Sequence, residues 1–204
     1  MAVYSRWIFP RLCDFLLDRP HVARHRRELL SDVTGDVLEI GFGTGLNLPH
    51  YPEHVRKITA VDPNPGMNRL ARLRAEQAET EVDVLPLRGE ELPFGDGTFD
   101  TVVSTFTLCS IDAVDRAVGE VYRVLRPEGR VLFLEHGLSH EPGVRKWQRR
   151  LNPLERRLGG GCRLDKDIPA IARRQPFRRV EVREFDLEKI PKTHGHLYRG
   201  TAAK

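Results

Sequence analysis

The 204-residue sequence is poor in cysteine and has no long apolar run. Its three cysteines, Cys13, Cys109 and Cys162, lie far apart and include no CxxC pair, so neither a disulfide framework nor a zinc ribbon is expected. No apolar run approaches the roughly 18 residues of a membrane span, and the N-terminus lacks the apolar region and cleavage site of a signal peptide. We therefore expect an intracellular, cytoplasmic protein in a reducing environment.

The charged residues are nearly balanced in number but unevenly distributed. The formal net charge is +4, with 33 basic and 29 acidic side chains. Residues 31–140 hold 10 basic and 18 acidic side chains, whereas residues 141–179 hold 12 basic and 4 acidic ones. The basic segment either meets a negatively charged partner, such as the surface of an anionic membrane, or forms the solvated faces of helices. The sequence leaves both alternatives open.

From Asp36 onward, short apolar runs alternate with helical patterns, which is typical of a parallel sheet with crossover helices. Two further strand-like segments, Phe177–Phe185 and Leu197–Ala203, close the chain. The pattern predicts an α/β fold: a doubly wound, mostly parallel, Rossmann-like sheet with helices on both faces and a C-terminal antiparallel strand pair. The expected parallel strands are Val37–Ile40, Lys57–Val61, Val82–Leu87, Phe99–Ser104 and Arg130–Glu135.

We expect one domain over residues 1–204, with additions at both ends of a central unit. Residues 1–30 form two short helices broken at Pro20 that cap a cleft, residues 31–140 form the ligand-binding core, and residues 141–204 form a basic lid and the last strands. The lid is helical over Val144–Gln175, with the three glycines that begin at Gly159 as a flexible joint. Trp147 is predicted to be the buried aromatic of a helix with a wet basic face, rather than a platform that stacks a nucleobase.

A glycine-rich loop follows the first expected strand. Glycines at this position permit a tight turn and let a ligand lie against the backbone. The pattern departs from the dinucleotide fingerprint because Leu46 takes the place of its last glycine and Glu39 stands two residues before its first. An anionic side chain beside the loop favours a cationic ligand over a pyrophosphate. The three glycines are Gly41, Gly43 and Gly45.

A carboxylate ends the second expected strand. Asp62 stands 21 residues beyond Gly41, where nucleoside-binding α/β proteins place an acid that accepts hydrogen bonds from two ribose hydroxyls. The alternative is a helix-capping aspartate beside an ordinary tight turn. The glycine loop and Asp62 together predict a nucleoside site.

These motifs resemble those of the class I S-adenosylmethionine-dependent methyltransferases over about residues 35–136. The resemblance implies that the glycine loop with Glu39 holds the methionine portion, that Asp62 holds the ribose, and that Gly89 and Glu90 lie against the adenine. It further implies S-adenosylmethionine as cofactor and S-adenosylhomocysteine as product. The motifs are Glu39-x-Gly41-x-Gly43-Thr44-Gly45, Asp62, Gly89-Glu90-Glu91-Leu92-Pro93-Phe94, Gly97-Thr98-Phe99-Asp100 and Glu120-x-x-Arg123-Val124-Leu125-Arg126-Pro127.

Further segments resemble a small group of single-domain enzymes that includes the membrane-associated alkyl thiol methyltransferases of animals. The resemblance implies a small or lipophilic acceptor: a thiol, or the amine or carbon of a lipid or quinone-like molecule. Those animal enzymes begin with a hydrophobic membrane anchor that this sequence does not show at its start, so we expect at most a peripheral contact with an anionic membrane. The segments are Thr107-Leu108-Cys109-Ser110, Phe133-Leu134-Glu135-His136 and Gly161-Cys162.

His136 is the candidate catalytic residue. It follows the last expected parallel strand, on the edge where α/β sheets bind ligands, and its imidazole titrates near neutral pH. It acts as the general base for a thiol acceptor, or it is a hydrogen-bonded structural histidine. Cys109 is expected to be an inert, partly buried thiol. No metal is expected, because His194 and His196 lack a third ligand at a recognisable spacing.

Two rival functions stay open. A nucleic-acid methyltransferase is the second enzymatic alternative, although nucleic acid is an unlikely partner for a chain without an aromatic-rich binding module or the signature of base amino methylation. A module that binds S-adenosylmethionine without turning it over would share the same cofactor motifs. Turnover with a panel of acceptors separates these alternatives.

Overall fold

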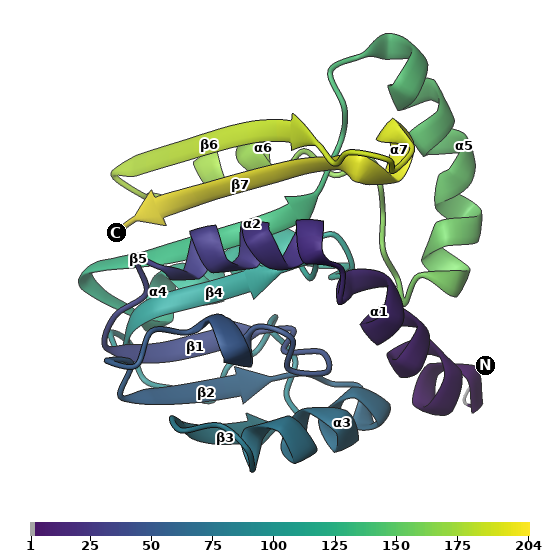
Figure 1. Ribbon diagram of the computed structural model, residues 1–204. Helices are drawn as coiled ribbons and strands as arrows, with labels where there is room; N and C mark the ends of the chain where they lie inside the picture. Colours follow the sequence, from purple (N-terminus) through teal and green to yellow (C-terminus); the bar gives the residue numbers. More distant parts are fainter. Residues whose placement is uncertain (1–2) are drawn as a thin grey trace.

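The computed structural model describes residues 3–204 as one seven-stranded sheet with helices on both faces (Figure 1). The strand order is β3-β2-β1-β4-β5-β7-β6, in which β1 to β5 pair in parallel and β7 runs antiparallel to both β5 and β6. This arrangement confirms the expected fold class. The strands are β1 (Asp36–Ile40), β2 (Lys57–Val61), β3 (Glu81–Leu85), β4 (Phe99–Thr105), β5 (Leu125–His136), β6 (Arg179–Asp186) and β7 (His196–Ala203).

Helices begin where the sequence offers a proline or a capping side chain. Pro20 lies in the first turn of α2, where its missing amide hydrogen leaves no acceptor unsatisfied. Asn64 caps α3 by accepting a hydrogen bond from the Gly66 amide at 2.9 Å. The helices are α1 (Phe9–Leu17), α2 (Pro20–Leu30), α3 (Pro65–Ala75), α4 (Val114–Val124), α5 (Pro142–Leu158), α6 (Ile168–Arg173) and α7 (Lys192–Gly195), with a π-helical turn at Tyr4–Ile8 and a 3-10 turn at Leu48–His50.

Alternating strand residues fill two apolar layers, one on each face of the sheet. Successive side chains of a strand point to opposite faces, so Val37 and Leu38 of β1 belong to different layers. The first layer is covered by α2, whose Leu29 and Leu30 are buried in it. The second is covered by α4, whose buried residues include Val121. The expected N-terminal cap included α2, but α2 packs into the core. The cap therefore consists of the Tyr4–Ile8 turn and α1 alone within the described residues.

Most strand boundaries lie within two residues of the expected ones, and the start of β5 differs by five. β3 ends at Leu85, two residues early. β5 begins at Leu125, directly after α4, because Leu125 pairs with Phe99 before the ladder shifts register to resume at Arg130. The segment between, with Glu128 at φ +66°, forms an irregular turn inside the strand. Periodicity alone did not distinguish this turn from the end of a helix.

The two terminal additions meet beyond the carboxyl ends of the parallel strands. Figure 1 shows α1 and α5 on the same side of the sheet, past the arrowheads of β2, β4 and β5. In open α/β sheets this edge is where ligands bind. The fold therefore brings both expected cover segments to the edge that carries the glycine loop.

Candidate active site

A cavity of about 850 Å³ lies at this edge. Its floor is formed by the loops that follow β1 to β5, and its cover by the Tyr4–Ile8 turn, α1 and the end of α5. The volume lies within the usual range for pockets that hold small molecules or cofactors. Of the expected site residues, the cavity is lined by Gly41, Gly43, Asp62, Glu90 and His136.

The glycine loop presents bare backbone to the cavity. Gly41 has φ +69°, and a Cβ on it would lie 2.0 Å from the Thr107 hydroxyl, so no side chain fits there. Gly43 has φ +59°, and the nearest atom to a Cβ placed on it would be the Gly41 carbonyl oxygen, 3.9 Å away. A flat or chain-like ligand can therefore lie directly against the Gly43 backbone.

Asp62 is held in place by backbone amides. Its side chain is buried, with Oδ2 accepting from the Gly43 amide at 2.9 Å and Oδ1 from the Asn64 amide at 2.8 Å. Burial raises the pKa of Asp62, and the two amides act against that increase. Each carboxylate oxygen can accept a further hydrogen bond. Asp62 therefore fits a ligand that carries two neighbouring hydroxyls, as a ribose does.

Glu39 lies beneath the loop and does not line the cavity. Its two oxygens accept hydrogen bonds from the Asn47 amide at 2.7 Å and from the Tyr51 hydroxyl at 2.6 Å. Asn47 in turn accepts from the buried Arg26 guanidinium at 2.7 Å. Burial raises the pKa of Glu39 to about 7. The structure thus places Glu39 in a buried hydrogen-bond network with Asn47, Tyr51 and Arg26. Direct contact of Glu39 with a ligand stays a prediction.

Two more expected contacts also lie outside the cavity lining. Gly45 follows the turn of the loop, and Gly89 packs so closely on Ile40 that a Cβ would lie 2.8 Å from its Cγ2. Glu90, the next residue, does line the cavity. The expected adenine contact of the Gly89–Glu90 pair is thus available to Glu90, and binding there stays a prediction.

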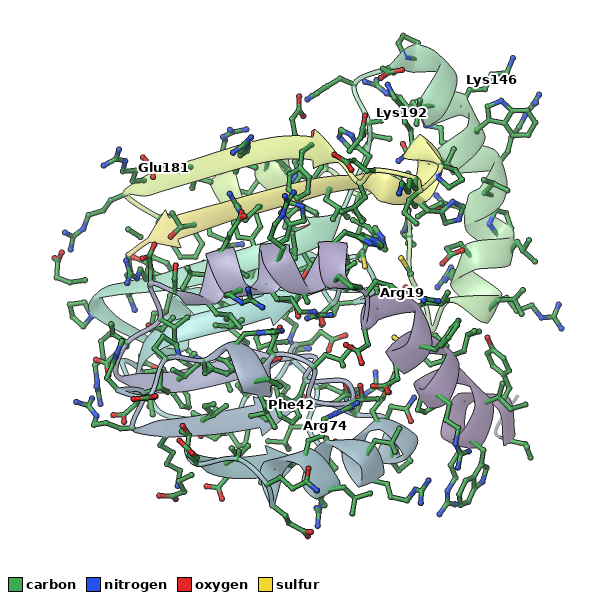
Figure 2. All side chains as sticks on the ribbon, viewed as in Figure 1. Arg19, Phe42, Arg74, Lys146, Glu181 and Lys192 are labelled. Carbon is green, nitrogen blue, oxygen red and sulfur yellow. The ribbon has the colours of Figure 1, made fainter. Side chains whose placement is uncertain are left out.

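An ion pair holds α1 against the glycine loop. The Arg74 guanidinium donates to Asp14 Oδ1 at 2.7 Å and to Oδ2 at 3.1 Å, and the Thr44 hydroxyl donates to the same Asp14 Oδ1. Arg74 also donates to the Thr44 carbonyl oxygen at 2.7 Å. Figure 2 shows Arg74 on the side of α3 that faces α1. These contacts connect the cover to both α3 and the loop that follows β1.

The N-terminal turn also contacts the end of α5. The Tyr4 hydroxyl donates to the Leu158 carbonyl oxygen at 2.6 Å. Gly160 has φ +65° and lies under the ring of Phe9, where a Cβ would be 2.4 Å from a ring carbon. The three glycines that begin at Gly159, expected to be a flexible joint, therefore form a tightly packed turn. This turn brings the two cover segments together.

Three residues from distant segments meet on the wall next to the carboxyl ends of β4 and β5. Cys109, His136 and Cys162 each offer a ligand atom, and these atoms all lie within 4.8 Å of one another. The two sulfurs are 3.4 Å apart, and Cys162 Sγ is 3.8 Å from His136 Nδ1. All three residues line the cavity. We refer to them as the Cys–His–Cys cluster.

The Cys–His–Cys cluster is largely shielded from solvent. Cys109 is 1% exposed and Cys162 6%, so Cys109 is fully buried rather than partly buried as expected. The hydrogen bond from Cys162 and burial raise the pKa of the Cys109 thiol well above its usual range. Burial opposes the charged form of His136, but the contact with Cys109 and the nearby carboxylates Glu135 and Glu155 together raise its pKa. The expected role of His136 as general base stays a prediction.

The buried side chain of Glu135 holds the loop that carries Cys109 in place through hydrogen bonds. Glu135 accepts hydrogen bonds from the Ser104 hydroxyl at 2.7 Å and from the amides of Thr107 at 2.8 Å and Cys109 at 3.3 Å. The Lys166 ammonium donates to two carbonyl oxygens of the same loop. The sequence showed Glu135 only as part of a motif, since its partners lie on β4 and the loop that follows it.

Apolar side chains are exposed on the N-terminal segment and on α5, and Leu12, Leu16 and Leu158 among them line the cavity. Trp147 is 55% exposed, so the prediction of a buried tryptophan is wrong. Within residues 3–204, no helix is both long and apolar enough to cross a bilayer. We call the following exposed residues of the N-terminal segment and α5 the apolar rim: Val3, Trp7, Ile8, Leu12, Phe15, Leu16, Trp147, Leu154 and Leu158.

Known proteins share these sequence and structural features. The profile of a methyltransferase domain matches residues 38–133. Thiol S-methyltransferase TMT1B of Homo sapiens is 35% identical over 94% of this chain and 84% of its own length. A phosphatidylethanolamine N-methyltransferase of Cereibacter sphaeroides is 31% identical over 96% of this chain and 92% of its own. A solved methyltransferase from Thermotoga maritima, described as a possible histamine N-methyltransferase, has a TM-score of 0.71 at 21% identity, covering 99% of this chain and 98% of that one.

Proposed function

The chain belongs to the class I S-adenosylmethionine-dependent methyltransferases and is related to their thiol S-methyltransferases, and on this premise we propose that it methylates a small lipophilic thiol. The family membership confirms the resemblance found in the sequence motifs, and it makes the protein an enzyme that uses S-adenosylmethionine as methyl donor. A lipid or quinone-like amine or carbon is the second acceptor class. The relative that acts on phosphatidylethanolamine supports that class.

The observation that carries the proposal is the division of the cavity into two chemically different ends. Asp62 and the bare Gly43 backbone lie after β2 and β1, and they suit the nucleoside and amino-acid parts of the cofactor. The loops after β4 and β5 form the other end, which carries thiols and apolar side chains. Because Leu158, at the end of α5, belongs both to the cavity lining and to the apolar rim, the second end is continuous with an apolar surface. A lipophilic acceptor fits that path.

S-adenosylmethionine, when bound, supplies a methyl group on a sulfonium that leaves as a neutral thioether, so no residue has to activate the donor. The protein's contribution is to orient the two reactants and to exclude water. Alignment of this kind is worth roughly 7–11 kcal/mol in favourable cases. Asp62 and the glycine loop orient the donor, and α1 with the end of α5 closes the cavity over both reactants.

Loss of the Asp62 carboxylate tests the cofactor end. Hydrogen bonds to charged groups contribute roughly 1.5–3 kcal/mol each, so Asp62→Ala is expected to weaken the binding of S-adenosylhomocysteine about tenfold or more. Isothermal titration calorimetry measures this effect. Asp83→Ala is the matched control, because Asp83 lies on β3 with its side chain 51% exposed. An unchanged dissociation constant in folded Asp62→Ala protein would remove the ribose assignment.

Turnover tests the acceptor end. Production of S-adenosylhomocysteine is measured with an alkyl thiol, with phosphatidylethanolamine vesicles and with a quinol, each at the same concentration of enzyme and donor. The thiol is expected to give the highest kcat/KM. Turnover confined to the phospholipid or the quinol would contradict the thiol proposal and leave the methyltransferase assignment intact.

The basic charge of α5 and the apolar rim also support a peripheral contact with an anionic membrane. Lys146 extends from α5 away from the rest of the molecule (Figure 2), and each basic residue near such a surface contributes about 1 kcal/mol. We expect co-sedimentation with vesicles that contain phosphatidylglycerol and much less with phosphatidylcholine alone. Phe15→Ser is expected to reduce it, whereas Leu73→Ser, at an exposed apolar position on α3, leaves it unchanged. Equal sedimentation of both variants would contradict the membrane contact.

A further inference from the structure

The geometry of the Cys–His–Cys cluster points to a metal site, and we propose that Cys109, His136 and Cys162 bind a zinc ion with one coordination position open to the cavity. This proposal departs from the sequence-based expectation of no metal, which considered only His194 and His196. Those two histidines face different acids in the structure: Glu155 at 3.4 Å and Asp186 at 2.9 Å.

Two of the three distances between the ligand atoms are close to those expected around a bound zinc ion. Zinc binds thiolate sulfur at about 2.3 Å and imidazole nitrogen at about 2.0–2.1 Å, so tetrahedral angles put two sulfurs about 3.8 Å apart and a sulfur about 3.6 Å from a nitrogen. The structure has the two sulfurs 3.4 Å apart and Cys162 Sγ 3.8 Å from His136 Nδ1. These two distances differ from the tetrahedral values by a few tenths of an ångström, and the remaining pair, Cys109 and His136, has its ligand atoms within 4.8 Å.

The ligand set also suits zinc chemically. Two thiolates and one neutral imidazole balance the charge of a divalent cation, so the complex adds no net charge to a buried wall. Two cysteines and one histidine with a fourth position left free is a known ligand set of catalytic zinc. On binding, each cysteine S–H bond breaks, a sulfur–zinc bond forms, and the proton passes to water.

The backbone around the ligands is already fixed. The Cys109 amide donates to Glu135, and its carbonyl oxygen accepts from the Arg163 amide at 3.0 Å. Cys162 follows Gly161, which has φ +95° and lies so close to the carbonyl oxygen of Ser110 that a Cβ would be 3.2 Å from it. This turn holds Cys162 against the loop of Cys109. A preorganised set of this kind is what a metal site needs, because little order has to be gained on binding.

The open position gives the ion a role in substrate binding. A thiol that reaches the cavity can take this position, where it loses its proton to water and stays bound as a thiolate, since a coordinated thiol is deprotonated outright. This role rests on the proposed thiol acceptor, whereas binding of the metal does not. In such a site His136 is a ligand and does not take the proton of the acceptor.

Metal content measures the site directly. Tag-free protein is incubated with zinc chloride and a phosphine reductant, desalted and analysed by mass spectrometry for metal. We expect about one zinc per chain in the wild type and in Cys13→Ser, the control at the cysteine outside the cluster. Cys162→Ser and His136→Gln are expected to bind zinc at least 100-fold more weakly, beyond the roughly 10–100-fold loss seen when outer partners of a metal are removed.

Two further measurements keep the test decisive. Binding of S-adenosylhomocysteine to each variant shows that the cavity is folded. Cobalt in place of zinc gives a thiolate charge-transfer band in the near ultraviolet, which is expected to be absent from a Cys109→Ser, Cys162→Ser double variant. Wild-type protein that keeps no zinc, or cluster variants that keep as much as Cys13→Ser, would overturn the metal site.

A thiol titration separates this proposal from the acceptor proposal. Adding 2-mercaptoethanol to the cobalt form is expected to change the charge-transfer band, because a further sulfur enters the open position. A cobalt spectrum that does not respond to the thiol overturns the role in acceptor binding, even where thiol turnover by the enzyme is observed. Zinc binding without any thiol turnover instead contradicts the proposed acceptor and leaves the metal site standing.

Discussion

The contact between Asp14 and Arg74 gives a quantitative prediction for the mobility of α1. Asp14→Ala removes three hydrogen bonds, two from Arg74 and one from Thr44, without lowering the helix propensity of α1. The two charged side chains are 26% and 31% exposed. Exposed ion pairs contribute up to about 1 kcal/mol and well-shielded charged hydrogen bonds about 1.5–3 kcal/mol. We therefore expect a loss of about 2 kcal/mol, which corresponds to about 30-fold more frequent opening of α1.

Amide hydrogen exchange in the absence of ligand measures this opening. Protection of the α1 amides is expected to fall about 30-fold in Asp14→Ala, while α2, which packs into the core, keeps its protection. Asp18→Ala is the control, because it removes the same charge from an exposed position just after α1. Equal protection of α1 in the two variants would refute the conclusion that Asp14 holds the cover closed.

Three further predictions concern the site. Burial raises the pKa of Glu39 from 4.5 to about 7 in the folded chain, so the contribution of Glu39 to folding stability is expected to fall by about 3 kcal/mol as pH rises from 4.5 to 7. Urea unfolding at both pH values measures this as a difference between the wild type and Glu39→Gln, and equal pH dependence of the two would contradict it. Gly41→Ala is expected to displace Thr107 and to lower affinity for S-adenosylhomocysteine at least tenfold by calorimetry, whereas unchanged affinity would show that the loop adapts. Binding of S-adenosylhomocysteine is expected to slow amide exchange in α1 and within Val144–Gln175, and unchanged exchange in both would contradict their role as a cover.

Local sequence patterns predicted the helices and strands of the fold well. They did not predict which strands pair with one another across the sheet. The apolar spacing of α4 and the strand of Val37 are local signals, and both elements form where expected. The antiparallel strand pair at the end of the chain was also expected. What periodicity does not encode is that β7 lies between β5 and β6, because the partner of a strand depends on the sheet as a whole.

The same limit explains which parts of the site the sequence missed. Asp62 and Gly43 lie at fixed distances from strand ends, so their positions follow from local motifs. Glu39 carries the same motif signal, but its burial depends on Asn47 and Tyr51, which only the folded loop brings beneath it. The Cys–His–Cys cluster draws one residue from each of three segments, and no spacing within the sequence marks it. Trp147 was misplaced because α5 rests on the molecule by one narrow face, with Gln148 as its buried residue.

The hydrogen bond from Tyr4 to the Leu158 carbonyl oxygen links the two cover segments, although the two residues are 154 positions apart in the sequence. α1 stands over the glycine loop, and the turn after α5 stands over the Cys–His–Cys cluster. We therefore expect that opening at one end of the cavity loosens the other. A molecule bound at the acceptor end is then expected to slow the departure of a cofactor at the opposite end, even where it leaves the cofactor's own contacts untouched. We accordingly expect the release rates of the two products to be coupled through this contact.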